Sequence, residues 1–247
     1  MAQTSHALPV SGTPYEGKAK ILASTATAGI WQVLFKDEAT AFNAQKRGFI
    51  RGKGEINCTM SSHLFQFLGR QGIPTHFVRQ TAPNVMEVYA LDMFALEVVV
   101  RNRAAGSLCR ETGLPLGLEL TPPLVEFYYK NDALGDPLLT PDRLRLLNLA
   151  TPVEVQTLTE MAQQINEHLC RFFAECGILL VDFKLEFGRD DQGRVLLADE
   201  ISPDTCRLWL AQESDPVRRV VDKDRFRYDL GEVESAYRLV LERVLRQ

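Results

Sequence analysis

Three charged residues alternate along one predicted strand, and their types suit the transfer of a phosphoryl group. Apolar residues occupy every second position from Val181 to Phe187, so Asp182, Lys184 and Glu186 must project from the opposite face of the strand. Carboxylate oxygens are ligands that Mg²⁺ prefers, and a lysine between two carboxylates can reach a phosphate. The alternative is a solvated sheet face, on which alternating charges are common. A charged turn follows shortly afterwards, which favours a functional site.

The turn after this strand decides which residues lie opposite one another. Residues 190–193 have a typical turn sequence, and if they form the loop, Lys184 lies opposite Asp199, with Glu186 diagonal to it. Diagonal neighbours lie ~7–8 Å apart at Cα, so two carboxylates could converge on one Mg²⁺. A single bulge would exchange Asp199 and Glu200, and the choice between these two carboxylates stays open.

A glycine stands beside two lysines in the segment 15–20. Glycine lets the backbone approach an anion closely, and lysines two residues apart, here Lys18 and Lys20, point the same way along a strand. Together with Gly17 they suit a polyphosphate, although the segment lacks the G-x-x-x-x-G-K-[ST] pattern of a P-loop. A solvated hairpin turn is the alternative.

An apolar strand predicted over residues 94–102 ends in Arg101, with Arg103 close behind and Ser107 in the following turn. Burying an arginine costs free energy unless it is paired, and a phosphate or a carboxylate is the usual partner. A phosphate site and a structural ion pair are therefore both open interpretations of this strand.

A basic loop containing Lys46, Arg47 and Lys53 precedes a stretch in which apolar residues recur every three or four positions. This spacing predicts an amphipathic helix over about 56–68. Because the N-terminus of a helix favours anions, the loop is a second candidate anion site.

The remaining elements that must position these residues are mixed α and β. Thr151, a proline at 152 and Glu154 form the start signal of a long helix that ends at Gly177. Six prolines between residues 115 and 152 mark connecting segments, where the chain changes lobe or sheet face. Further strands are predicted at 31–35, 75–79 and 85–91, and a closing helix at 232–245.

Length and composition exclude several classes of protein. At roughly 150 residues per domain, 247 residues allow one large domain or two interlocked lobes. With 45% apolar and 24% charged residues the chain is an ordinary folded protein, and its net charge of −4 predicts no general binding of nucleic acid. No apolar run reaches the ~20 residues that would cross a membrane. Five cysteines without a C-x-x-C pair argue against disulfides and zinc, and we expect a reducing cytoplasm.

Six motifs resemble, in their order, those of the SAICAR synthetase family of purine biosynthesis. They are YEGKAK at 15–20, EVVVRNRAAGS at 97–107, KND at 130–132, LVDFKLEFG at 180–188, DEISPDTCRLW at 199–209 and KDRFRYDLG at 223–231. Two positions depart from the family pattern. Ala95 replaces a proline before the arginine strand, without an expected loss of chemistry, and Cys206 replaces a small polar residue, which suggests sensitivity to oxidation.

The resemblance implies an α+β fold of two lobes related to ATP-grasp enzymes and kinases. Antiparallel sheets with flanking helices would place ATP in a cleft between the lobes. We expect a flexible tail at 1–14, an N-terminal nucleotide-binding lobe at 15–92 and a C-terminal substrate- and metal-binding lobe at 93–247. A homodimer is left open.

The implied activity is an ATP-dependent ligation. ATP, L-aspartate and 5-aminoimidazole-4-carboxylate ribotide would give the succinocarboxamide, ADP and phosphate, by way of an acyl phosphate. Such a step depends on positioning and charge neutralisation, so no protein nucleophile is needed. The rival hypotheses are another ATP-dependent kinase or carboxylate-amine ligase, and a nucleotide-binding module without turnover.

The resemblance also implies which residues hold the nucleotide and the metal. The predicted nucleotide ligands are Gly17, Lys18, Lys20, Asp92, Met93, Lys130, Lys184 and Glu186. Among them Asp92 and Met93 would meet adenine through their backbone, and the first glycine and its two lysines would hold the phosphates. Mg²⁺ would bind Glu186 and Asp199.

The remaining roles concern the other substrates. The predicted ribotide ligands are Arg101, Ser107, Asp182, Asp204 and Arg207, with the arginines and the serine on the 5′-phosphate and the aspartates near the imidazole. The predicted catalytic residues are Lys184, Asp182 and Asp204. Lys184 would bridge the phosphoryl group and the substrate carboxylate. The only candidates for binding L-aspartate are Lys46, Arg47 and Lys53.

Overall fold

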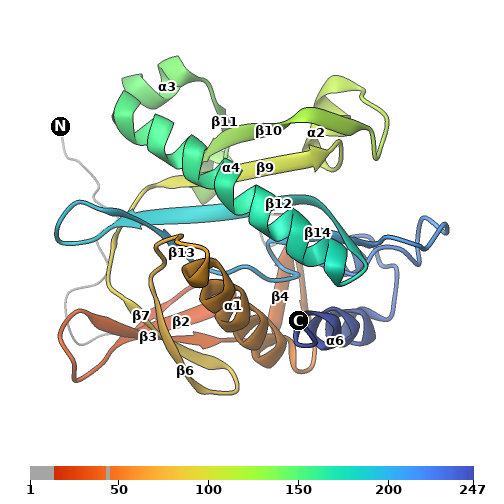
Figure 1. Cartoon of the computed structure of the whole chain (residues 1–247), viewed down its shortest axis with the longest axis horizontal. Coiled ribbons are helices and arrows are strands. Elements are labelled where there is room, and N and C mark those ends of the chain that lie inside the picture. The colour runs from red at the N-terminus through yellow and green to blue at the C-terminus, as the bar shows by residue number, and fades with distance from the viewer. Residues whose placement is uncertain (1–13, 43–44) are drawn as a thin grey trace.

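Two antiparallel sheets form the frame of the computed structural model, which describes residues 14–42 and 45–247 (Figure 1). The first sheet has the strand order β1-β2-β3-β7-β6, with bounds Tyr15–Glu16, Lys20–Ser24, Ile30–Phe35, Val85–Tyr89 and Phe77–Ala82. The second has the order β11-β10-β9-β12-β13, with bounds Leu138–Leu139, Glu119–Tyr129, Leu96–Arg103, Ile178–Arg189 and Val195–Ala198. Strand β12 also pairs with β14 (Cys206–Leu210) and β8 (Asp92–Met93). A separate hairpin joins β4 (Glu38–Ala41) to β5 (Lys46–Phe49).

One long helix covers each sheet. Helix α1 (Lys53–Arg70) packs on β3, β6 and β7, and α4 (Pro152–Glu175) packs on β9, β10 and β12 (Figure 1). Helix α6 (Val233–Val244) packs on α1, so the end of the chain returns to the first sheet. The shorter helices are α2 (Ser107–Thr112), α3 (Pro141–Leu146), α5 (Asp224–Arg227) and the 3₁₀ turn η1 (Asp132–Leu134). In the described part of the chain, no helix is both long and apolar enough to cross a membrane.

The start of α4 confirms its predicted capping box. The Thr151 hydroxyl accepts a hydrogen bond from the Glu154 amide at 3.2 Å, and the Glu154 carboxylate accepts one from the Thr151 amide at 2.8 Å. These two bonds satisfy amides that the first turn of a helix leaves without a partner. The predicted helices over 56–68 and 232–245 are confirmed as α1 and α6.

The largest apolar cluster of the described residues spans the two sheets. It includes Val33 of the first sheet, Leu64 of α1, Val98 of the second sheet, Leu169 of α4 and Val240 of α6. The fold is therefore the mixed α+β arrangement of antiparallel sheets and helices that the sequence predicted. Because the core is continuous, the division into lobes at residue 92 stays a prediction. The expected tail at 1–14 lies almost entirely outside the described residues.

A short segment, Pro74–His76, is hydrogen-bonded to both sheets. The His76 amide donates to the Leu197 carbonyl at 2.8 Å, and the Leu197 amide donates to the Pro74 carbonyl at 2.9 Å. The His76 carbonyl in turn accepts from the Tyr89 amide at 2.7 Å. This contact with β13 explains why the strand predicted at 75–79 begins only at Phe77.

Candidate active site

A cavity of about 740 Å³ lies between the two sheets and is lined by strands of both. Every residue predicted to hold the nucleotide, the metal or the ribotide lines it, with the exception of Asp92. The Asp92 side chain is 66% exposed and faces Arg189, with a carboxylate–guanidinium distance of 3.3 Å. An adenine contact through the backbone of this residue stays a prediction.

Lysines and carboxylates alternate on the cavity floor. Lys184 Nζ lies 2.5 Å from Glu186 Oε1, 3.2 Å from Glu97 Oε1 and 3.5 Å from Asp199 Oδ2. Lys130 forms an ion pair with the other oxygen of Glu186. Burial alone would lower the pKa of Lys184, but the facing carboxylates raise it well above its ordinary value. The ammonium group therefore stays charged at physiological pH.

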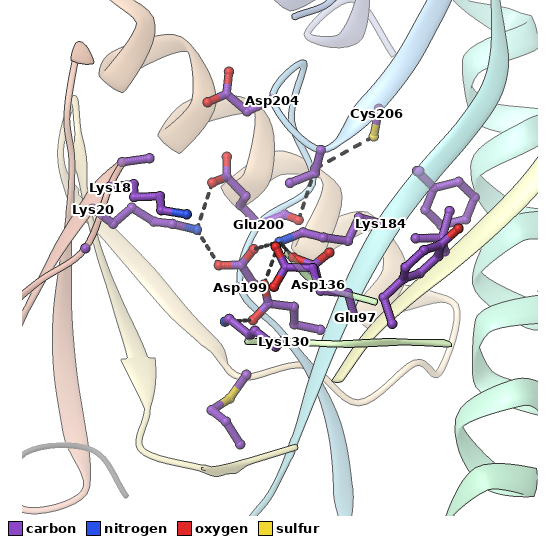
Figure 2. Close-up of a pocket in the computed structure, with 18 of the residues that line it drawn as sticks. Lys18, Lys20, Glu97, Lys130, Asp136, Lys184, Asp199, Glu200, Asp204 and Cys206 are labelled. Carbon is purple, nitrogen blue, oxygen red and sulfur yellow. Dashed lines mark hydrogen bonds and ion pairs between the residues drawn. The ribbon is translucent and has the colours of Figure 1, made fainter. Parts of the chain in front are cut away.

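Lys20 reaches the same cluster from the first sheet. It forms ion pairs with Asp199 and with Glu200, the latter at 2.8 Å (Figure 2). The side chain of Glu200 is 4% exposed, and its second oxygen accepts a hydrogen bond from the Ser202 hydroxyl at 2.5 Å. Asp199 is 17% exposed, and its pKa is lowered because Lys20 and Lys184 outweigh the effect of its burial. Asp199 is thus the more open of the two carboxylates.

The predicted register of the hairpin between β12 and β13 is wrong by one residue. Arg189 pairs with Val195, and the Asp190 amide donates to the Arg194 carbonyl at 3.0 Å, so the loop has three residues. Gly193 takes φ 75°, and its amide donates to the Asp190 carbonyl, which is the geometry of a type I turn followed by a glycine bulge.

The shifted register places Glu186 opposite Ala198, so Lys184 is not paired with Asp199 in the ladder. Strand β13 ends at Ala198, and Asp199 adopts φ 63°, which turns the chain toward the cavity. Asp199 and Glu200 consequently both reach Lys20, although they are neighbours in sequence. The alternation of side chains along a strand was used to predict which of the two carboxylates faces Lys184. It no longer applies after Ala198, where β13 ends.

Asp182 lies between two arginines at another part of the cavity. Arg101 Nη1 and Arg207 Nη1 approach its Oδ2 at 3.0 and 2.8 Å. Arg101 also donates to Glu126 at 2.7 Å and to the Ser107 hydroxyl at 3.0 Å. Arg101, near the end of β9, is therefore paired with carboxylates of the protein itself. This agrees with the structural ion pair, which was one of the two interpretations of this strand. A ribotide phosphate bound here would meet guanidinium groups that are already oriented.

Asp204 accepts bonds from three side chains, namely Lys53 at 3.1 Å, Lys223 at 3.3 Å and the Tyr237 hydroxyl at 2.8 Å. Burial would raise the pKa of Asp204, but the two lysines and the tyrosine lower it below its usual range. A carboxylate held in this way is a hydrogen-bond acceptor rather than a base that takes up a proton near neutral pH.

Among the described residues of the basic loop before α1, the N-terminus of the helix is not an open anion site. The Asp37 carboxylate accepts hydrogen bonds from the Gly52 and Gly54 amides at 2.9 and 2.8 Å, and so occupies the N-terminus of the helix. Lys46 forms an ion pair with Asp229 at 2.6 Å. None of Lys46, Arg47 and Lys53 is among the described residues that line the cavity. Their proposed contact with L-aspartate stays a prediction.

The other end of the cavity is apolar. Leu22 and Val33 of the first sheet, Val88 of β7, and Leu91 and Met93 near β8 line it. At its rim Lys18 forms an exposed ion pair with Asp132 at 2.6 Å. An apolar end next to a row of lysines suits a purine base followed by a chain of phosphates.

Several residues of the site are not among those predicted from the sequence. Glu97 could have been predicted from the alternation of side chains along β9. Glu97, Val99 and Arg101 share one face of this strand, and that face lines the cavity. Lys223 and Tyr237 lie 19 and 33 residues along the chain from their partner Asp204, and although Lys223 begins the motif at 223–231, no local pattern links either residue to Asp204.

The predicted metal site was compared with the arrangement of metal-ligating side chains. No group of three or more His, Cys, Asp or Glu side chains among the described residues is arranged to hold a metal ion by itself.

Cys206 is 3% exposed, and burial raises the pKa of its thiol. This argues against an oxidation-sensitive cysteine, since the reactive form is the thiolate.

Comparisons with known proteins identify the family. Residues 13–244 match the family model of SAICAR synthetase. A phosphoribosylaminoimidazole-succinocarboxamide synthase from Thermosynechococcus vestitus is 65% identical over 94% of this chain and 95% of its own length, and one from Cyanothece sp. is 66% identical over 94% and 96%. The solved structure of a SAICAR synthetase (Type-2) in complex with ADP superposes with a TM-score of 0.91 at 44% identity, over 95% of this chain and 98% of that one. The chain therefore belongs to the SAICAR synthetase family of purine-biosynthesis ligases, which confirms the prediction from its motifs.

Proposed function

We propose that the cavity between the two sheets joins L-aspartate to 5-aminoimidazole-4-carboxylate ribotide at the expense of ATP. The γ-phosphoryl group passes to the ribotide carboxylate and gives an acyl phosphate and ADP. The aspartate amine then attacks the acyl carbon, phosphate leaves, and the amine loses a proton. The observation that supports this most directly is the row of Lys20, Lys130 and Lys184 between an apolar end and a pair of oriented arginines.

ATP fits the cavity with its adenine at the apolar end and its phosphates along the lysines. Gly17, Lys18 and Lys20 line this side, and the backbone of Gly17 turns back on Lys20 through an amide–carbonyl bond of 2.8 Å. The related SAICAR synthetase solved with ADP supports use of an adenine nucleotide here. Lys130 and Lys184 remain next to the position of the transferred group.

Magnesium fits the carboxylates on the cavity floor. Mg²⁺ is usually held by one or two carboxylates together with substrate phosphates, so a cage of three protein ligands is not needed. Glu186 and Asp199 are the candidates, because their oxygens are paired with lysines of the cavity, whereas one oxygen of Glu200 is held by the hydroxyl of the buried Ser202. When bound, the ion would neutralise negative charge on the transferred phosphoryl group.

The chain's own residues orient the reactants and hold charge. Lys184 provides an ammonium group that stays protonated, so it stabilises the charge that develops between the phosphoryl group and the substrate carboxylate. Arg101 and Arg207 are oriented by Asp182 before the ribotide arrives.

We place the reaction in the cytoplasm. We also propose that the enzyme is a homodimer, which light scattering can test.

A coupled assay of ADP release tests the proposal. Release should require both the ribotide carboxylate and L-aspartate, and other amino acids should not replace aspartate. Release without either substrate would contradict the ligase and favour an ATP hydrolase or another kinase. Nucleotide binding without release would favour a module that binds but does not turn over.

A further inference from the structure

Two of the three side chains that bond Asp204 do not face the cavity. Its Oδ1 accepts from the Tyr237 hydroxyl at 2.8 Å, and its Oδ2 accepts from Lys53 at 3.1 Å and from Lys223 at 3.3 Å. Asp204 and Lys223 line the cavity, whereas Lys53 and Tyr237 are 1% and 0% exposed and are not among its described lining residues.

Tyr237 lies on the face of α6 that packs into the protein. The other buried residues of this helix are Ala236, Val240 and Val244, all of them apolar. A buried tyrosine hydroxyl needs a hydrogen-bond partner, and here that partner is a carboxylate of the cavity. Packing alone could be served by phenylalanine, so the hydroxyl points to a role at Asp204.

The hydroxyl restricts how Asp204 can turn. With one donor on Oδ1 and two lysines on Oδ2, both carboxylate oxygens are fixed, and Lys223 is held at the cavity wall. Loss of the hydroxyl leaves a buried carboxylate oxygen without its partner, which is costly and favours rotation of the side chain. Rotation would move the anchor of Lys223.

We propose that Tyr237 is a positioning residue, whose hydroxyl fixes Asp204 so that Asp204 presents Lys223 to an anionic group of a substrate. The group is a phosphate or a carboxylate, and it belongs to the ribotide or to L-aspartate. This inference rests on the proposed function, because it concerns substrates of that reaction.

The test is the variant Tyr237→Phe, with Tyr129→Phe as its matched control. Tyr129 is half-buried and packs against the core. For Y237F we expect KM to rise about tenfold for the substrate that Lys223 holds, and KM for ATP to change less than twofold. The substrate whose KM rises identifies the anionic group. Unchanged constants, or a uniform loss of kcat that simply follows a fall in Tm, would overturn the proposal.

A double-mutant cycle with Asp204→Asn tests the route of the effect. If Tyr237 acts through Asp204, the double variant should be no worse than D204N alone, whereas additive losses in kcat/KM would overturn the proposal. Lys53→Met removes a second donor from the same carboxylate and should raise the same KM, even if Y237F yields little folded protein. An inactive wild-type enzyme would contradict the proposed function itself, while an active one with normal Y237F and K53M would contradict only this inference.

Discussion

The guanidinium of Arg207 lies against the backbone of Gly106, so closely that a Cβ atom on this glycine would come within 2.5 Å of Nη2. Gly106 also adopts φ 58°, which side-chain-bearing residues rarely do. It precedes Ser107 at the start of α2, so one glycine shapes the surroundings of two predicted ribotide ligands. No other residue type satisfies both the contact and the backbone angle.

The variant Gly106→Ala should therefore displace Arg207 from Asp182. We expect kcat/KM for the ribotide to fall at least about tenfold, since a bond between charged groups is lost, and Tm to fall by several degrees from backbone strain. Steady-state kinetics and thermal unfolding check this. Gly29→Ala is the control, because Gly29 has φ 74° with no atom within 4 Å of an added Cβ. If G29A lost as much activity as G106A, displacement of Arg207 would not be the cause.

The variants Asp199→Asn and Glu200→Gln should separate two roles. Asp199 is a candidate metal ligand, so D199N should raise the Mg²⁺ concentration needed for half-maximal rate and lower kcat about 100-fold. Glu200 bonds Lys20 and Ser202, so E200Q should raise KM for ATP and leave the Mg²⁺ dependence unchanged. Glu119→Gln, at the exposed first residue of β10, provides a matched control. The reverse pattern would exchange the two assignments.

Stability should fall on acidification because of His76. This side chain is buried against Phe65, and burial lowers its pKa to about 4, although Asp199 opposes the shift. The unfolded chain therefore binds the proton first, and stability is lost as pH falls from about 6.5 through about 4. Chemical unfolding of wild type and His76→Leu across this range should show a smaller slope for the variant. Parallel curves would show that His76 does not contribute.

The capping box of α4 should affect stability without affecting turnover. Thr151→Ala removes the hydroxyl that accepts from the Glu154 amide, at a cost of about 1 kcal/mol, or roughly 2–4 °C in Tm for a chain of this size. Thr157→Ala is the control, since its exposed hydroxyl bonds only the Val153 carbonyl within the helix. A loss of activity in T151A at a temperature where it is fully folded would contradict this separation.

Local patterns predicted the three longest helices and the shared face of the charged residues on β12. The capping box at Thr151 and the stripe of α1 depend on residues a few positions apart, so the sequence alone contains them. The alternation around Lys184 likewise placed three charged residues on one face that lines the cavity.

Contacts between distant segments could not be predicted in this way. The register of the hairpin between β12 and β13 depended on the left-handed backbone conformation of Gly193. This conformation forms a bulge, which shifts every residue pair between the two strands by one position. The N-terminus of α1 looked like an anion site, but Asp37 of another loop occupies it. Tyr237 reaches Asp204 across 33 residues, and only the folded chain brings them together.

The segment Pro74–His76 has a mechanical consequence for the cavity. Its backbone bonds join β7 to β13 close to Asp199, so the two sheets cannot slide past each other without breaking them. If the space between the sheets widens, these bonds should keep the separation smallest next to Asp199 and let it be larger at the opposite rim. The candidate metal ligand Asp199 should therefore keep its distance from Lys20 more closely than residues at that rim keep theirs.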